Sequence, residues 1–246
     1  MSRVYQVSDL FHTSWEALST KKHAEVYALM QELSVAKPGS RRYGFLLIAV
    51  LAQLNRNPRL VDRINEKQAV DIFNDLSFLR EPWYHFPVIE SEGMVKPDDK
   101  MARHTFDHFI YADNEFSNYT IHRDQKYLRR LLVTLYQKQF DSEAVDELSG
   151  KLWAEDYELS LVFFTYAQVR EFVMKRCKTL LPPAGKSTAE ETTQQARPTG
   201  SMWLKLKHRL AETPAFQGYE TAGKARMYAA LDYLEDLAKN QQEKKK

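Results

Sequence analysis

Residues 109–116 read FIYADNEF and residues 127–136 read YLRRLLVTLY, and these two segments decide the fold. Both lie in the stretch 103–177, where apolar side chains recur at the spacing of one helix face. The most continuous apolar segment of the chain, residues 159–174, follows after a short break. We therefore expect consecutive helices whose apolar faces cover one another. The predicted fold class is mainly α, a multi-helix bundle.

The composition of the whole chain agrees with this prediction. A chain of 246 residues with 43% apolar and 12% aromatic residues can bury a full core. Eight glycines are few, and the nine prolines are clustered, which favours helices over a turn-rich β sandwich or barrel. Outward from the central stretch, helices are expected from residue 21, and over 41–54, 66–79, 102–119, 124–137, 142–152, 155–178, 202–212 and 221–239.

The pattern also predicts how the chain is divided. Residues 1–181 should form a helical main domain, and residues 182–200, which are rich in polar residues, Gly and Pro, have the composition of a flexible linker. Residues 201–240 should form a C-terminal hairpin of two amphipathic helices, and residues 241–246 a disordered basic tail. Because such a hairpin is too small to be stable alone, we expect it to dock on the main domain, on a second copy or on a partner.

The best candidates for metal ligands are two histidines on one helix face. His104 and His108 are spaced i and i+4, and Asp107 could supply a third ligand. This spacing is common, and two histidines on a helix surface explain it without a metal. A metal-dependent enzyme at His104 and His108 is therefore kept as an alternative, while no metal or cofactor is expected.

Asp113 lies among aromatic residues, a setting that can raise the pKa of a carboxyl for acid–base chemistry. A half-buried carboxylate must also find hydrogen-bond donors, and Arg129, Arg130 and Arg170 are available. We therefore expect a structural role for Asp113 and not a catalytic one. The other positions expected to be structural are Phe109, Tyr136 and Phe163.

The sequence favours a protein without enzymatic activity. It contains no nucleophile elbow, phosphate-binding glycine loop, dinucleotide fingerprint or zinc-ribbon spacing. Its single cysteine, Cys177, excludes an intramolecular disulfide and has no pattern of catalytic partners. No apolar signal segment opens the chain, and its longest apolar run, residues 43–52, is about half the length that spans a bilayer. A cytoplasmic location without a membrane partner is expected.

The expected partner is another protein, bound when one of its apolar helices is buried against the C-terminal hairpin or the main bundle. The net charge of +2 is evenly mixed and gives no electrostatic reason to expect nucleic acid. A nucleic-acid-associated accessory protein is an alternative, because basic residues within 205–209 could meet phosphates. The residues expected to bind the partner protein are Trp203, Leu206, Leu210, Met227, Leu231 and Leu234.

Three segments carry a family resemblance. Residues 109–114, the Leu-Leu-x-x-Leu-Tyr pattern of residues 131–136 and the apolar run within 162–175 resemble proteins of bacteriophage and prophage tail-morphogenesis regions. The opening SWEALS of residues 14–19 is similar to the way those proteins begin. The resemblance implies a helical protein that acts by protein–protein contact, such as a tail assembly chaperone that shields the tape-measure protein. It would place the chain in the host cytoplasm or the virion and would allow an oligomer.

Overall fold

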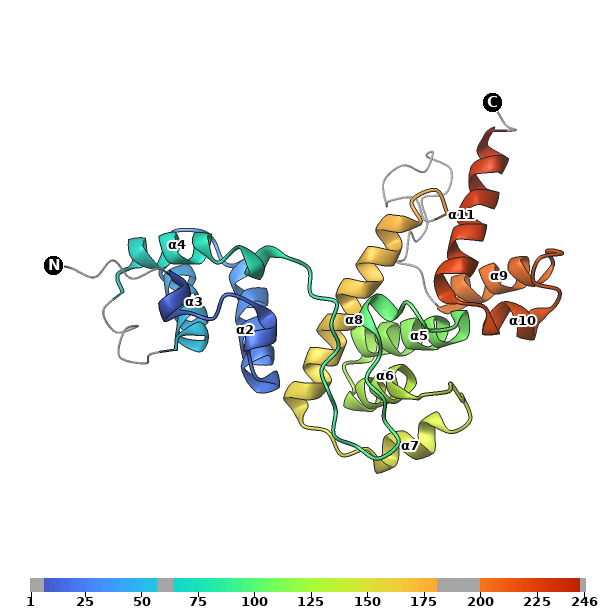
Figure 1. Ribbon diagram of the computed structural model, residues 1–246, viewed down its shortest axis with the longest axis horizontal. Coiled ribbons are helices and arrows are strands. Elements are labelled where there is room, and N and C mark those ends of the chain that lie inside the picture. The colour runs from blue at the N-terminus through green and yellow to red at the C-terminus, as the bar shows by residue number, and fades with distance from the viewer. Residues whose placement is uncertain (1–6, 57–63, 181–199, 244–246) are drawn as a thin grey trace. The chain divides into compact units, whose positions relative to one another are not determined.

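The computed structural model describes residues 7–56, 64–180 and 200–243 (Figure 1). These ranges are mainly helical and contain isolated bridges but no β-strand, which confirms the predicted fold class. Apolar residues that recur along the chain at helical spacing favour these helices, and a polar side chain caps the first turn of five of them.

The chain divides into two compact units, and neither matches the expected main domain of residues 1–181. Unit 1 comprises Met1–Trp83 and Glu155–Phe164, and unit 2 comprises Tyr84–Ala154 and Thr165–Lys246. The long helix α8 (Asp156–Arg176) contributes its first part to unit 1 and the remainder to unit 2. The C-terminal helices belong to unit 2, because their apolar faces pack on its central helix.

Unit 1 begins its helices at polar caps. Ser19 and Ser40 each accept a hydrogen bond from a backbone N–H of the first turn, and Asn65 forms a capping box with Gln68. The helix expected over 66–79 ends early, because Leu76 leaves the helical conformation and a short 3-10 helix follows. The elements are α1 (Val7–Leu10), η1 (Trp15–Ala17), α2 (Thr20–Val35), α3 (Arg41–Leu54), α4 (Glu66–Asp75) and η3 (Ser77–Arg80).

The core of unit 1 is organised around the indole of Trp15. The ring stacks on His23 with centroids 4.5 Å apart, and its Nε1–H donates to the carbonyl of Phe78 at 3.0 Å. Trp83 meets the same His23 ring edge-on. Burial lowers the pKa of His23 to about 4, so this imidazole is neutral at pH 7 and belongs to the core.

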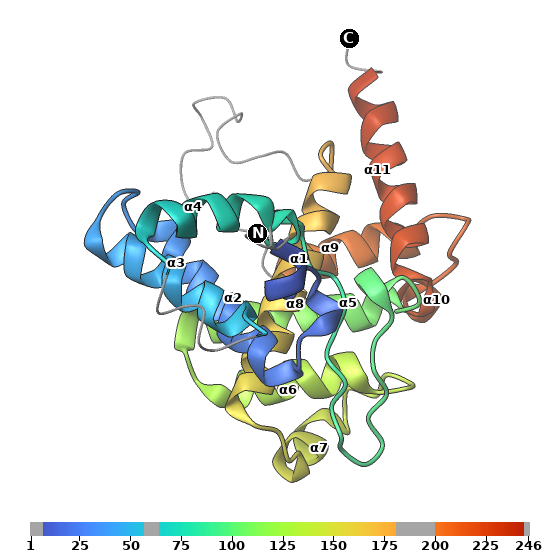
Figure 2. The ribbon, with the colours of Figure 1, turned by 60° about the vertical axis from the view of Figure 1, so that its left-hand side comes forward.

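Unit 2 is built on α5, whose start is capped by the Thr105 hydroxyl. Next to it, α6 is capped by Asp124 and ends in Tyr136, which donates a hydrogen bond to the carbonyl of Pro87 at 2.6 Å. Figures 1 and 2 show α5 beside α6, with α9 and α10 packed at one end of α5. Besides its part of α8, the elements of unit 2 are η4 (Asp99–Met101), α5 (Phe106–His122), α6 (Gln125–Tyr136), α7 (Val145–Lys151), α9 (Gly200–Ala211), α10 (Tyr219–Lys224) and α11 (Met227–Glu243).

The C-terminal segment has three helices where two were expected. The predicted helix over 221–239 is interrupted because its backbone binds the chain just before α5. The N–H of Phe106 donates to the carbonyl of Ala225, and the N–H of Met227 donates to the carbonyl of His104, both at 2.9 Å. These bonds remove Ala225 and its neighbour from a continuous helix and join the segment to α5.

Two further boundaries differ from the sequence prediction or fall outside the structure. The expected linker, residues 182–200, lies outside the described residues except for Gly200, which begins α9. The expected tail, 241–246, begins within α11, because that helix continues to Glu243. Residues 244–246 are not among those described.

Candidate functional site

Asp113, in the third turn of α5, joins three helices. Its Oδ1 accepts a hydrogen bond from Nε of Arg170 on α8 at 2.5 Å, and its Oδ2 accepts one from Nε1 of Trp203 on α9 at 2.7 Å. Tyr166, one turn before Arg170, is fully buried and also hydrogen-bonds to this carboxylate. We call Asp113, Tyr166, Arg170 and Trp203 the Asp113 cluster. These hydrogen bonds link α5 to α8 and to α9 within unit 2.

The electrostatics of the Asp113 cluster are those of a structural ion pair. Burial raises the pKa of Asp113, while the positive charge of Arg170 and the hydrogen bonds from Arg170, Trp203 and Tyr166 oppose that rise. The carboxylate has no exposed surface, so a substrate cannot reach it in this conformation. The cluster therefore joins α5, α8 and α9 through one buried carboxylate. Of the three arginines proposed from sequence, Arg170 is the one that donates to this carboxylate.

The other positions expected to be structural divide between the units. Phe109 is buried and meets the Trp203 indole edge-on, with centroids 4.8 Å apart. Tyr136 is also buried in unit 2. Phe163 is half-buried and belongs to unit 1. The first two support the same core as Asp113, and Phe163 does not.

The three candidate metal ligands do not converge. His104 places Nε2 at 3.0 Å from the carbonyl of Leu135, and His108 places Nδ1 at 3.0 Å from the Thr105 hydroxyl. The carboxylate of Asp107 instead forms an ion pair with a lysine of α9. Within the described ranges, no three His, Cys, Asp or Glu side chains are grouped so that they could hold a metal ion. The two histidines are buried core residues and not the surface pair that was expected.

Burial lowers the pKa of His108 to about 3, with a smaller contribution from the neighbouring His104. The imidazole is therefore neutral at pH 7. Its ring packs on Phe140, with centroids 4.8 Å apart, and Phe140 in turn lines a pocket described below. His108 thus supports a wall of this pocket from inside the core.

A second contact between α5 and α9 lies six residues before Asp113. The Nζ of Lys207 forms an ion pair with Oδ1 of Asp107 at 2.6 Å and lies 3.7 Å above the ring centroid of Tyr219. The side chain of Lys207 is only 7% exposed, whereas that of Asp107 is 24% exposed. An ammonium held between a carboxylate and an aromatic ring combines an ion pair with a cation–π interaction. On one side, this contact faces a solvent-accessible pocket.

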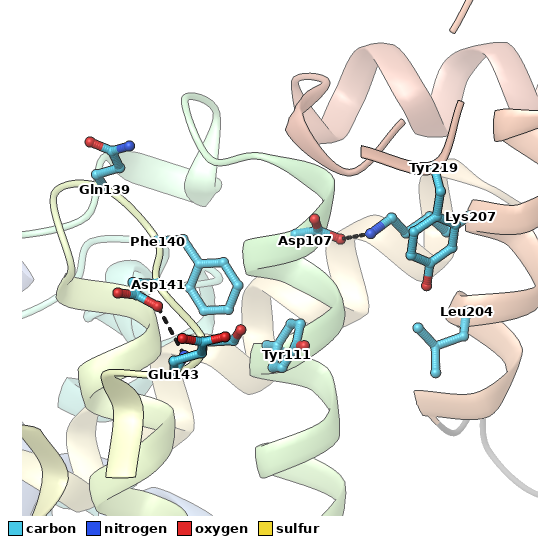
Figure 3. Close-up of a pocket in the computed structure, with 10 residues that line it drawn as sticks. Asp107, Tyr111, Gln139, Phe140, Asp141, Glu143, Leu204, Lys207 and Tyr219 are labelled. Atoms are coloured by element: carbon cyan, nitrogen blue, oxygen red, sulfur yellow. Dashed lines mark hydrogen bonds and ion pairs between the residues drawn. The ribbon is translucent and has the colours of Figure 1, made fainter. Parts of the chain in front are cut away.

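The open side is a pocket of about 670 Å³, which we call the Asp107 pocket (Figure 3). Its walls come from α5, from the loop between α6 and α7, and from α9 and α10. Figure 3 shows Phe140, Asp141 and Glu143 on one side, and Leu204, Lys207 and Tyr219 on the other. Its lining residues are Asp107, Tyr111, Gln139, Phe140, Asp141, Ser142, Glu143, Leu204, Lys207 and Tyr219.

The Asp107 pocket combines negative charge with exposed apolar surface. It contains three carboxylates and one ammonium, a formal excess of two negative charges. Tyr111, Leu204 and Tyr219 are 39%, 41% and 39% exposed, so large apolar groups remain available at its rim. A concave site with aromatic walls and a few charged groups is typical of a binding site.

Sequence reasoning missed this pocket because its walls come from segments far apart in the chain. One signal was present: Tyr111 lies two residues from both Phe109 and Asp113, and such a position is turned away from the buried face of a helix. Asp141 and Glu143 line the pocket because of the conformation of the loop after α6, and the spacing of residues in the sequence does not predict that conformation.

The residues expected to bind a partner protein face the chain itself. Leu206 is half-buried, and the other five are buried within unit 2. They lie on α9 and α11, which both contact α5, and Trp203 meets Phe109 of that helix edge-on. This differs from the expected exposed hairpin face. The five buried residues are Trp203, Leu210, Met227, Leu231 and Leu234.

The basic strip within 205–209 does not form a continuous phosphate-binding face. Lys205 and His208 are exposed, but Lys207 is buried against Asp107 and Tyr219. The most buried cation of the strip is therefore already neutralised inside the protein. Cys177 is also buried, and burial raises the pKa of its thiol to about 12, so the thiol remains protonated at pH 7.

Comparison of the chain with protein-family models, with curated proteins and with solved structures gave no match. Among the described helices, none combines the length and the apolar character required to cross a bilayer.

Proposed function

We propose that this protein is a non-enzymatic binding factor and that it holds a segment of another polypeptide in the Asp107 pocket. The observation that carries the proposal is the exposure of Tyr111, Leu204 and Tyr219 around one concave site. Aromatic side chains at a pocket supply large contact area at low cost in conformational entropy. Because α9 is fixed to α5 by the Asp113 cluster, the two sides of the pocket are held in place before a partner arrives.

The proposed binding surface for the partner differs from the hairpin face that the sequence led us to expect. Burial of a partner helix against Trp203, Leu210 or Leu231 would require unit 2 to open, since these side chains are fully buried. The Asp107 pocket needs no such opening. A tail assembly chaperone would be one case of this function, in which the bound segment belongs to a tape-measure protein.

Selection from a random displayed peptide library on the full-length chain tests the proposal. The selected peptides are then measured by fluorescence polarisation against the wild type, Leu204→Asp and a matched control, Ile121→Asp. Both leucine and isoleucine are exposed in unit 2, but Ile121 lies at the far end of α5. We expect at least about tenfold weaker binding for Leu204→Asp, because a charge replaces an apolar contact.

The control should bind like the wild type, and circular dichroism should show that both variants keep the helical fold. Equal affinity for the wild type and Leu204→Asp would contradict the proposal. A tape-measure partner is tested separately, by forming the complex from purified components and asking whether Leu204→Asp weakens it.

A further inference from the structure

The two sides of the Asp107 pocket carry the same chemistry, but the chain supplies a cation to only one of them. On the first side, the ammonium of Lys207 lies between the Asp107 carboxylate and the Tyr219 ring. We call this the Lys207 wall. It shows, within this protein, how the pocket holds a positive charge.

The opposite side, which we call the loop wall, consists of Phe140, Asp141 and Glu143 together with Tyr111 of α5 (Figure 3). The rings of Phe140 and Tyr111 have their centroids 4.8 Å apart. Asp141 Oδ1 accepts a hydrogen bond from the backbone N–H of Glu143 at 2.9 Å, which fixes the loop. Two carboxylates thus stand beside two aromatic rings.

None of the ion pairs formed among the described residues involves Asp141 or Glu143. The excess of two negative charges in the pocket therefore belongs to the loop wall, since Lys207 neutralises Asp107. A ligand that complements this wall must carry positive charge, and the adjacent rings favour a cation that can also make a cation–π contact.

From this charge complementarity we infer that the loop wall receives a lysine or arginine side chain of the partner polypeptide. The inference rests on the proposed function and specifies the chemistry of its ligand. A polypeptide fits better than a free polyamine, because Leu204, Tyr111 and Tyr219 leave apolar surface at the rim for residues that flank the basic side chain. The Lys207 wall and the loop wall then each hold one cation.

Peptide pools that fix a single central residue test this inference on the full-length protein. The fixed residue is arginine, lysine, or a neutral counterpart of similar shape, citrulline or norleucine, and the flanking positions are degenerate. We expect the basic pools to bind roughly tenfold more tightly than the neutral pools, the sum of one ion pair and one cation–π contact at a partly exposed site. The preference should weaken as salt is added.

The variant Asp141→Asn with Glu143→Gln should lose this preference while remaining folded, because both side chains are exposed. The matched control is Glu90→Gln with Glu92→Gln, which makes the same change in charge at two exposed positions of unit 2 outside the pocket. Its preference for basic pools should equal that of the wild type.

Three results would overturn the inference. The first is equal affinity for the basic and the neutral pools, with binding that Leu204→Asp still weakens. This result would contradict the inference but not the proposed function. Another is an unchanged preference in the Asp141 and Glu143 variant. A third is binding of spermidine alone as tight as that of the arginine pool, which would identify a free polyamine as the ligand. If no pool shows binding that depends on Leu204, the proposed function itself fails.

Discussion

Helices α5 and α9 meet at two carboxylates that have similar partners and different surroundings. Asp113 accepts a hydrogen bond from Trp203, and six residues earlier Asp107 forms an ion pair with Lys207. The first contact is fully buried and saturated by donors, whereas the second opens into a pocket. The comparison teaches that burial, and not residue type, separates a carboxylate that holds the fold from one that borders a binding site.

The physical reason is the cost of leaving a charge without partners. In the Asp113 cluster, water cannot replace a lost donor, so removing one partner exposes the full desolvation penalty. At Asp107 the carboxylate is 24% exposed, so water compensates it for a lost ion pair, and the Lys207 ammonium, although buried, keeps its contact with the Tyr219 ring. Stability should therefore depend strongly on Asp113 and only weakly on Asp107, which borders the pocket.

The largest effect is expected for Asp113→Ala. It leaves the guanidinium of Arg170, whose side chain is 12% exposed, without its carboxylate and removes the acceptor of the Trp203 indole. We expect unit 2 to lose about 3–5 kcal/mol of unfolding free energy. Urea denaturation followed by circular dichroism measures the loss.

Asp236→Ala serves as the control, because Asp236 is an exposed aspartate of α11, and it should change stability by less than about 0.5 kcal/mol. The double variant Asp113→Leu with Arg170→Leu should be less destabilised than Asp113→Ala alone, since no buried charge remains. A loss of under 1 kcal/mol for Asp113→Ala would show that the cluster does not hold the helices.

The second effect is a pH dependence from His108, which lies on α5 between the two carboxylates. Its pKa is about 3 in the folded chain against 6.5 without the protein environment. Between these values the unfolded chain binds a proton that the folded chain does not, so stability falls as the pH falls. By pH 4 the loss should be on the order of 3 kcal/mol.

Comparison with His108→Gln isolates this contribution, because the variant cannot take up the proton. Urea midpoints measured from pH 7 to pH 4 should converge for the two proteins as the pH decreases. Parallel curves would mean that His108 does not stay neutral in the folded state. His23, whose pKa is lowered to about 4 in unit 1, contributes equally to both proteins and cancels.

Trp203→Phe should have the third-largest effect. Phenylalanine retains most of the edge-on packing against Phe109 but cannot donate to Asp113. One carboxylate oxygen is left buried without its donor, which costs about 1–3 kcal/mol. The same substitution in the Asp113→Ala background should cost less, and the difference between the two losses measures the coupling of the pair. Additive losses would show that the hydrogen bond contributes nothing.

The helices could be predicted from the sequence, and a structural role could be expected for Asp113, because both inferences depend on local patterns. The period of apolar residues marks α5 and α6, and polar residues such as Ser40 and Thr105 mark helix starts. A carboxylate that is buried among aromatic residues requires hydrogen-bond donors, whatever part of the chain supplies them. That requirement gave Arg170 as one of three candidate donors, with Arg129 and Arg130, and it could not identify Trp203, which lies ninety positions away in the sequence.

The pocket and the course of the C-terminal segment could not be predicted, because both depend on contacts between distant backbones. The break between α10 and α11 exists because Ala225 and Met227 hydrogen-bond to Phe106, the first residue of α5, and to His104 just before that helix. The same segment carries Tyr219, which lies over Lys207, and the apolar residues Met227, Leu231 and Leu234, which are buried although they looked available for a partner. Amphipathic periodicity reports that a helix face will be covered, and it does not report what covers it.

The smallest effect on stability is expected for Gly223→Ala in α10. This substitution disturbs the contact of Asp107 with Lys207 and leaves the Asp113 cluster unchanged. A Cβ at Gly223 would overlap Oδ2 of Asp107 and lie 2.7 Å from its Oδ1, so the carboxylate must turn away from Lys207. Alanine favours the helix over glycine by about 1 kcal/mol, which offsets the loss of an ion pair whose carboxylate can turn to solvent while the lysine keeps the Tyr219 ring. The net change in unfolding free energy should stay within about 1 kcal/mol.

The local change should nevertheless be large, because Lys207 loses its carboxylate. Acetylation of Lys207, followed by mass spectrometry with the exposed Lys205 as internal reference, should become severalfold faster in Gly223→Ala. Asp107→Asn should show the same acceleration, and combining the two substitutions should add nothing, since both remove one interaction. If Gly223→Ala leaves the acetylation rate unchanged, the Asp107–Lys207 ion pair does not depend on the space that Gly223 leaves for the carboxylate. The contrast between a closed contact that determines stability and an open contact that can be rearranged at little cost would then be contradicted.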